Sequence, residues 1–220
     1  MTTRTLHSWK EDILQNFQIR KNAQQKTAFI EHLAKIYGDR MHVEESGKLL
    51  KSRNIVIGNP DTASVVFGAH YDTCARLPFP NFITPKNFVI FLLYQIFIGV
   101  IMIVPLLLVV IPFTTLLVWL DLPDGLDLIL SESLLIAGAV GLYVLIVAGP
   151  ANPHTANDNT SGVVTVLTLA DRLADRNDLC FVLFDHEETG LFGSAAFAKA
   201  HKNVRDHTLV VNFDCVSDGD

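Results

Sequence analysis

The sequence predicts an α/β domain, with a mostly parallel sheet covered by helices on both faces, that is interrupted by a hairpin of two transmembrane helices. Short apolar runs alternate with segments of helical periodicity, which is typical of such a sheet. A long apolar block lies between them, and acidic residues and a histidine follow the predicted strands. We therefore expect residues 1–86 to begin the domain, 87–149 to form the hairpin and 150–220 to continue the domain.

Two helices are expected near the N-terminus. Ser8 and Glu11 form a capping-box pattern at the start of the first helix, and the second covers residues 23–37 with Gly38 as its C-cap. The remaining pattern predicts strands at 53–57, 64–68, 179–185 and 208–214, and helices at 161–173 and 194–201.

The apolar block is long enough for two membrane spans. Residues 88–120 contain no charged side chain, whereas about 20 apolar residues suffice to cross a bilayer. We place the first span at 88–110, with the remainder of the run as a kinked extension or an interfacial segment, because Pro105 and Pro112 should kink or end the helix. The second span is placed at 128–149.

Residues 121–127 form the expected turn between the spans. Ala137, Gly138 and Gly141 are small enough for the second span to pack closely on the first. The alternative is a pair of buried core helices in a soluble protein, which would not need so long an uncharged run.

Composition excludes some partners and constrains the compartment. The chain has 17 Lys and Arg against 23 Asp and Glu, so a nucleic-acid partner has no electrostatic support. Three cysteines form no metal-like spacing and are expected to be free thiols in a reducing compartment. The first 40 residues are polar and charged, so we expect no secretory signal peptide.

Candidate ligands follow the predicted strands. His70 and Asp72 come directly after the strand at 64–68, at the carboxyl edge where open α/β sheets bind ligands. Their H-x-D spacing suits a metal-bound imidazole oriented by a carboxylate, although a core histidine would explain it as well. Asp158 precedes the helix at 161–173, where a carboxylate can bridge two cations or simply cap the helix.

Three more carboxylates follow buried strands. Glu187 and Glu188 are adjacent, so their side chains diverge and one can bind a metal while the other handles a proton. Asp214 ends the last predicted strand. Taken alone, the glutamate pair could be a solvated acidic loop and Asp214 a turn aspartate. Four such strand-end motifs in order favour a two-metal hydrolytic site instead, because imidazole and carboxylates are good zinc ligands.

The order H-x-D, N-D-N-x-S-G, E-E-x-G-x-x-G-S and N-F-D, over residues 53–72 and 154–214, resembles the M28 metallopeptidases, which are co-catalytic dizinc aminopeptidases. The resemblance implies a zinc-exopeptidase-like fold, two Zn²⁺ ions in the complete protein, and a cis peptide between Asp158 and Asn159. It implies these roles: His70, Asp158, Glu188 and Asp214 bind metal, with Asp158 bridging, while Glu187 is the general base and Asp72 orients His70.

The sequence departs from the family in two ways. The family's last zinc ligand is a histidine downstream of the N-F-D motif, and this sequence ends six residues after Asp214, so we expect a fragment whose fifth ligand lies beyond residue 220. Soluble members also lack the hairpin. Cys74 is expected to be a free loop thiol, and His154 and His186 to be surface or outer residues of the site.

Function follows from the resemblance, with two alternatives. We expect a membrane-anchored aminopeptidase that acts on peptides and contacts a lipid bilayer, of unknown oligomeric state. The first alternative is a glutaminyl cyclase with a single zinc, which the His70 ligand disfavours. The second is a membrane scaffold with a degenerate peptidase domain, which the intact Glu187–Glu188 pair disfavours.

Orientation is predicted from charge. His70 precedes the hairpin and Asp158 follows it, so the number of spans between them must be even if both reach one centre. Arg76 and Lys86 flank the first span, whereas the 121–127 turn has neither Lys nor Arg. Positive residues are enriched in cytoplasmic segments, so the catalytic domain of this multi-pass protein is expected to face the cytoplasm.

Overall fold

The computed structural model describes residues 4–48, 50–76, 87–123 and 125–217. The chain divides into two compact units, one made of residues 1–74 and 151–220 and the other of residues 75–150. Lys86, on which the predicted orientation partly depends, lies outside the described residues.

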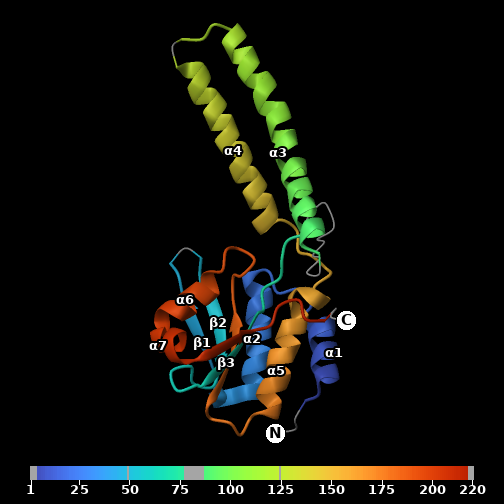
Figure 1. Cartoon of the computed structure of the whole chain (residues 1–220), viewed down its shortest axis with the longest axis vertical. Helices are drawn as coiled ribbons and strands as arrows, with labels where there is room; N and C mark the ends of the chain where they lie inside the picture. Colours follow the sequence, from blue (N-terminus) through green and yellow to red (C-terminus); the bar gives the residue numbers. More distant parts are fainter. Residues whose placement is uncertain (1–3, 49, 77–86, 124, 218–220) are drawn as a thin grey trace. The chain divides into compact units, whose positions relative to one another are not determined.

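The first unit contains a five-stranded sheet in the order β1-β2-β4-β3-β5 (Figure 1). The strands are β1 (Met41–Ser46), β2 (Ser52–Ile57), β3 (Val65–His70), β4 (Leu179–Phe184) and β5 (Leu209–Asn212). β3 pairs in parallel with β4 and with β5, whereas β2 pairs antiparallel with β1 and with β4. The α/β class is confirmed, and the sheet is mixed because the β1–β2 hairpin adds two antiparallel pairings.

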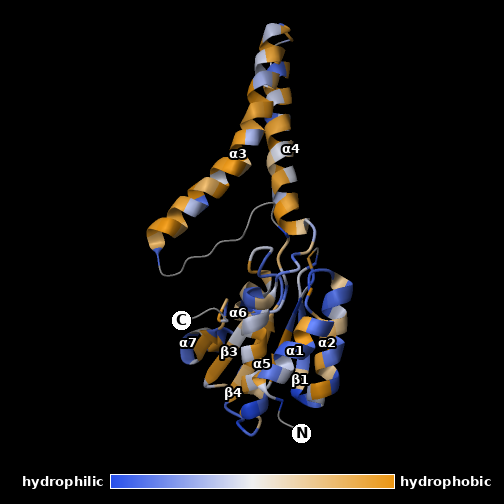
Figure 2. Cartoon of the chain, turned by 90° about the vertical axis from the view of Figure 1, so that its right-hand side faces the viewer, coloured by the Kyte–Doolittle hydropathy of each residue, from blue (hydrophilic) through white to orange (hydrophobic). Residues whose placement is uncertain are grey.

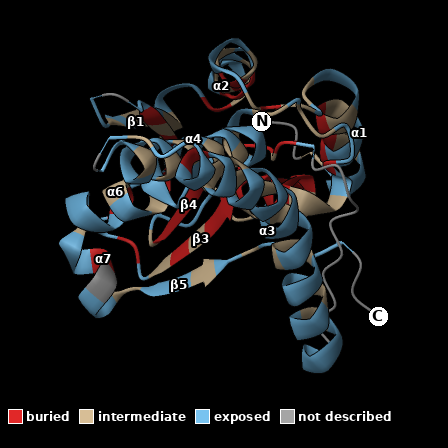
Figure 3. Cartoon of the chain, turned by 90° about the horizontal axis from the view of Figure 1, so that it is seen from above, coloured by how far each residue is buried: buried red, intermediate tan, exposed pale blue. Residues whose placement is uncertain are grey.

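Helices cover both faces of this sheet, as predicted. Along β2, Ile55 and Ile57 belong to one apolar cluster and Val56 to the other, because successive strand residues point to opposite faces. The first cluster also holds apolar residues of α1 (Leu6–Asn16), α2 (Ala23–Tyr37) and α5 (Gly162–Arg172). The second holds Phe197 of α6 (Phe192–Ala200) and Val204 of α7 (Lys202–His207). Figure 3 shows β3 and β4 largely buried between these layers and β5 less so.

Most predicted elements are found within one to three residues of their expected bounds. α2 has the predicted bounds, and Gly38 follows it with a φ of 55°. The expected capping box at Ser8 is wrong: Thr5 is the N-cap of α1, and the Ser8 amide donates to its Oγ1. A capping box is instead formed by Asn22 and Gln25 at the start of α2.

The second unit consists of two long apolar helices, α3 (Phe88–Trp119) and α4 (Leu126–Ala148). Figure 2 shows hydrophobic residues along both helices. Both are long and apolar enough to cross a membrane, which is weak evidence for membrane association. None of the most apolar window of either helix is buried, so these helices do not have the burial of core helices.

The first apolar helix is longer than the predicted 88–110 span. Pro105 and Pro112 both lie inside α3, which runs on to Trp119 and bends along its length (Figure 2). Each proline removes only one backbone donor, so the hydrogen bonds on either side of it keep the segment helical although it bends.

Close packing within the hairpin occurs at one of the predicted small residues. A Cβ atom on Gly138 would lie 2.2 Å from Cδ1 of Leu106 on α3, whereas a Cβ on Gly141 would meet nothing within 4 Å. Gly138 is therefore the position at which the lack of a side chain lets the two helices approach.

Candidate metal centre

Four segments of the first unit bring polar side chains to the carboxyl edge of the parallel strands. His70 is the last residue of β3 and Asp72 follows it, the residues after β4 supply Glu187 and Glu188, and those after β5 supply Asp214. Because β3, β4 and β5 run in the same direction, their ends meet at one edge. Asp158 reaches this edge from the irregular turn Ala156–Ser161, which precedes α5.

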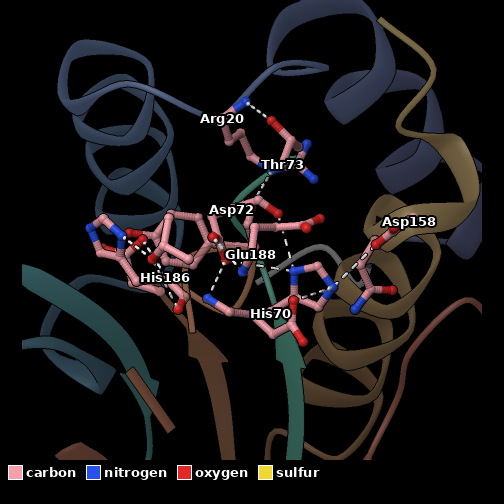
Figure 4. Close-up of polar contacts among 12 residues, drawn as sticks. Arg20, His70, Asp72, Thr73, Asp158, His186 and Glu188 are labelled. Atoms are coloured by element: carbon pink, nitrogen blue, oxygen red, sulfur yellow. Dashed lines mark hydrogen bonds and ion pairs between the residues drawn. The ribbon is translucent and has the colours of Figure 1, made fainter. Parts of the chain in front are cut away.

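His70 is 3 % exposed and lies at the middle of the cluster (Figure 4). Its Nδ1 lies 3.1 Å from the backbone oxygen of Asp72, and its Nε2 lies 3.3 Å from Asp158 Oδ1, 3.6 Å from Asp214 Oδ1 and 4.0 Å from Glu187 Oε2. Burial alone would lower the pKa of His70, but hydrogen bonds to Asp158, Asp214 and Asp72 raise it to about 12. One imidazole nitrogen is thus oriented by the chain, while the other faces carboxylates.

Asp72 connects the ends of two strands. Its carboxylate accepts hydrogen bonds from the backbone N–H groups of Glu187, at 3.1 Å, and Glu188, at 3.2 Å. Burial opposes ionisation, but contacts with His70 and Lys26 and these backbone donors hold the pKa of Asp72 below its usual range. His70 Nδ1 lies closer to the backbone oxygen of Asp72 than to its carboxylate, which is 3.6 Å away. The orienting role of the Asp72 carboxylate stays a prediction.

Asp158 is positioned by Asn159, with which it shares the cis peptide bond that the resemblance implies. The buried Asn159 side chain donates to the Phe213 backbone oxygen at 2.9 Å and accepts from the N–H of Gly162 at 3.0 Å. A Cβ on Gly162 would lie 2.4 Å from the Phe213 oxygen, so only glycine fits there. The turn that carries Asp158 is therefore attached to the strand end that carries Asp214.

Glu187 and Glu188 differ in environment. The Glu188 Oε1 atom is buried and has no hydrogen-bond partner in the part of the chain that the structure describes, and burial together with the nearby Asp158 carboxylate raises the pKa of Glu188 to about 8. The Glu187 side chain is 35 % exposed, and burial raises its pKa to a smaller extent, with His70 opposing. Their backbone is anchored by Asp185, which accepts from buried Lys26 and from the N–H of Arg53.

The donor set fits divalent cations. Donor atoms of His70, Asp158 and Asp214 lie within 4.8 Å of one another, and so do those of His70, Glu187 and Glu188, and those of Cys74, Asp158 and Glu188. Carboxylates gathered at a partly buried site need a positive charge, and the partnerless Glu188 oxygen shows that the chain's own donors leave one acceptor unsatisfied. Nitrogen and oxygen donors of this kind suit zinc.

Arg20 is a component of the site edge that the sequence did not predict. Its guanidinium is completely buried, and it donates to the Tyr71 backbone oxygen at 2.6 Å and to Thr160 Oγ1 at 3.1 Å, while its N–H donates to Thr73 (Figure 4). Burial lowers the pKa of Arg20 to about 10, against the effect of Asp72. The Arg20 guanidinium thereby connects the H-x-D segment to the turn after Asp158.

The other singled-out residues lie near or outside the cluster. His154 is exposed, and His186 Nδ1 lies 3.0 Å from Thr189 Oγ1. Cys74, Cys180 and Cys215 are free, as predicted. An apolar cavity of about 360 Å³ opens beside the cluster, and its lining includes His70, Glu187 and Asp214 together with Leu191, Phe197 and Ala198.

Comparisons with known proteins give one family match and one structural likeness. Residues 141–220 match the model of Peptidase family M28, so the recognition of an M28-type metallopeptidase is confirmed for that stretch. The structure is similar to the LapA aminopeptidase of Legionella pneumophila, with a TM-score of 0.44 and 14% identity, over 96% of this chain and 40% of that chain. The chain thus spans well under half of that structure. No curated protein matches this chain.

Proposed function

We propose that this chain belongs to a membrane-anchored, zinc-dependent metallopeptidase that hydrolyses peptide bonds and releases N-terminal residues. The observation that carries the proposal is the meeting of one buried imidazole with Asp158, Glu187, Glu188 and Asp214 at the carboxyl edge of the sheet. The match of residues 141–220 to the M28 peptidases supports the same chemistry.

Two cation positions are supported by the donor groups. His70, Asp158 and Asp214 would hold one ion, and Asp158 with Glu188 would contribute to the second. A pair of zinc ions supplies Lewis-acid polarisation of the substrate carbonyl and a water made nucleophilic at neutral pH. Asp158 is the residue common to both positions.

Glu187 is the general base in this proposal. Its partly exposed carboxylate lies at the cluster without being enclosed by it, so it can reach a water and a substrate. It accepts a proton from the attacking water and gives that proton to the leaving amine. Asp72 positions Glu187 and Glu188 through their backbone N–H groups.

The apolar cavity would accommodate the side chain of the substrate's N-terminal residue. Three of its lining residues, His70, Glu187 and Asp214, belong to the cluster, while Leu191, Phe197 and Ala198 give it an apolar wall. An apolar residue at the cleaved N-terminus fits such a wall best.

The experiment that tests the proposal measures zinc and turnover together. The purified chain in detergent is dialysed, analysed for metal and assayed with leucine nitroanilide. We expect bound zinc and hydrolysis, with Glu187→Gln keeping zinc and losing about 10²–10⁴-fold in turnover. The matched control is Glu132→Gln in α4, which should change neither. Bound zinc without any Glu187-dependent hydrolysis would favour the scaffold alternative.

The hairpin anchors the chain and the peptidase unit faces the cytoplasm. Arg76 precedes α3, whereas the described residues of the turn between the helices include Asp121 and no Lys or Arg. A cysteine introduced at Gly125 should react with an impermeant maleimide in intact cells, and one at Lys202 should not. The unsubstituted chain gives the background from its own cysteines, and the reverse pattern of labelling contradicts this orientation.

A further inference from the structure

Cys74 is held at the edge of the candidate metal centre by Asn152. The backbone oxygen of Cys74 accepts from the Asn152 N–H at 3.1 Å, and its Sγ accepts from Asn152 Nδ2 at 3.3 Å. The thiol is partly buried and forms no disulfide. These two contacts with Asn152 fix the position of Cys74.

The position of Sγ relative to the carboxylates is the main observation. Cys74 Sγ and one carboxylate oxygen each of Asp158 and Glu188 lie within 4.8 Å of one another. A second group of the same size joins His70, Asp158 and Asp214. These two groups share Asp158, which is the arrangement expected of two cations bridged by one carboxylate, and a third group, His70, Glu187 and Glu188, shares one residue with each of them.

Glu188 supplies an independent sign of a ligand in the Cys74 group. Its Oε1 atom is buried and has no hydrogen-bond partner among the described residues. A buried carboxylate oxygen without a partner costs free energy unless a cation or donor fills its position. Glu188 also belongs to the group that contains Cys74 Sγ and Asp158.

We propose that Cys74 is a metal ligand, and that its thiolate joins Asp158 and Glu188 among the ligands of the second cation of the centre. This inference rests on the proposed function, because it assigns a ligand to the metal pair of that function. As the bond between sulfur and metal forms, the bond between sulfur and hydrogen breaks and the proton is released to solvent. Asn152 orients the sulfur by its hydrogen bond, as outer partners of metal ligands do.

A thiolate ligand changes which metals the position accepts. Cysteine sulfur favours zinc and cobalt, whereas magnesium and manganese prefer oxygen donors alone. The Cys74 position should therefore retain zinc against an excess of magnesium more strongly than the His70 position, whose other ligands are both carboxylates.

The test uses cobalt as a spectroscopic probe in the complete purified chain in detergent. Apo protein is titrated with Co²⁺, and we expect a near-ultraviolet charge-transfer band from thiolate to cobalt. The band should disappear in Cys74→Ala and Cys74→Ser and persist in the matched control Cys180→Ala, whose thiol lies in β4. Asn152→Ala should keep the band but weaken cobalt binding about 10–100-fold.

A second measurement avoids any dependence on folding of the variants. Unsubstituted protein is alkylated with iodoacetamide, with and without Zn²⁺, and the modified cysteines are located by mass spectrometry. Protection of Cys74 by zinc is expected. If the chain binds two cobalt ions without the band, or zinc leaves Cys74 reactive, Cys74 is not a ligand while the proposed function stands. If the chain binds no cation at all, both proposals fail.

Discussion

The hairpin and the metal centre are encoded in different ways. The two helices of the hairpin depend mainly on neighbours close in sequence, since a continuous apolar run forms α3 and another forms α4. The centre takes single residues from four segments, and a packed sheet is needed to bring them together. A local change in the hairpin should therefore stay local, whereas a change of one centre residue should be felt by the others.

The largest contrast is expected between two glutamates, one in each region. Glu188→Ala removes a ligand of the proposed second cation, and zinc affinity should fall by more than the roughly 10–100-fold that loss of an outer partner costs. Glu132→Ala, in an exposed position of α4, should leave zinc affinity unchanged. Competition with a fluorescent chelator measures both constants. Equal affinities in the two variants would contradict the assignment of Glu188.

Removal of the buried Arg20 guanidinium at the edge of the site should have the next largest effect. Arg20→Met keeps most of the side-chain volume but leaves the Tyr71 oxygen and Thr160 without their donor. We expect a loss of about 2–4 kcal/mol in stability, seen as a lower thermal unfolding midpoint. The control is Arg176→Met, whose guanidinium pairs with Asp178 in an exposed position and should not shift the midpoint.

A smaller effect is expected inside the hairpin. Gly138→Ala places a methyl group against Leu106, at the end of a side chain that can move, whereas Gly141→Ala meets nothing. We expect Gly138→Ala to weaken the packing of α3 on α4 by about 1 kcal/mol and Gly141→Ala not to. The measurement is the temperature at which protease cuts the turn between the helices in detergent. Zinc affinity should be the same in both variants.

The smallest predicted effect depends on pH and lies in the first unit. Burial lowers the pKa of His201, but hydrogen bonds with Asp61 and Glu44 outweigh it and raise the pKa above the usual value. This contribution to stability is complete below about pH 6.5, the pKa of an unfolded histidine, and is lost as pH rises through the folded pKa. His201→Gln should lower the free energy of unfolding by less than about 1 kcal/mol at pH 6, seen as a lower thermal unfolding midpoint. At high pH the substitution should leave that midpoint unchanged. An effect that grows with pH would contradict this sign.

The elements that the sequence predicts well are those that depend on residues close in sequence, and those that it does not predict depend on distant contacts. α2 was predicted at its observed bounds because its apolar spacing and its C-cap glycine are local. β1 was missed because Met41–Ser46 is a mostly polar strand whose pairing with β2 supplies its stability. α3 continues past its prolines to Trp119, which is one of the two outcomes that the sequence left open, because a proline removes only one donor from an otherwise uninterrupted helix.

Within the site, the sequence identified residues by their place after strands. His70, Asp158, Glu187, Glu188 and Asp214 are brought together by the fold, and their roles stay predictions. Arg20 could not be singled out, because a basic residue in a polar segment usually lies at the surface and only its complete burial reveals its contacts. Cys74 is a free thiol, as the sequence predicts, but its position beside Asp158 and Glu188 could not be predicted because both lie far away in sequence.

The place of the hairpin in the chain also fixes the order of events during synthesis. His70 and Cys74 leave the ribosome before either apolar helix, and Asp158, Glu188 and Asp214 leave after both. Because chains emerge from the N-terminus onward, the nascent protein holds an imidazole and a thiol but not their carboxylate partners while the hairpin is being made. The two apolar helices are therefore complete before the proposed metal centre can assemble, and a ribosome-bound chain that stops before Asp158 lacks three of the proposed ligands.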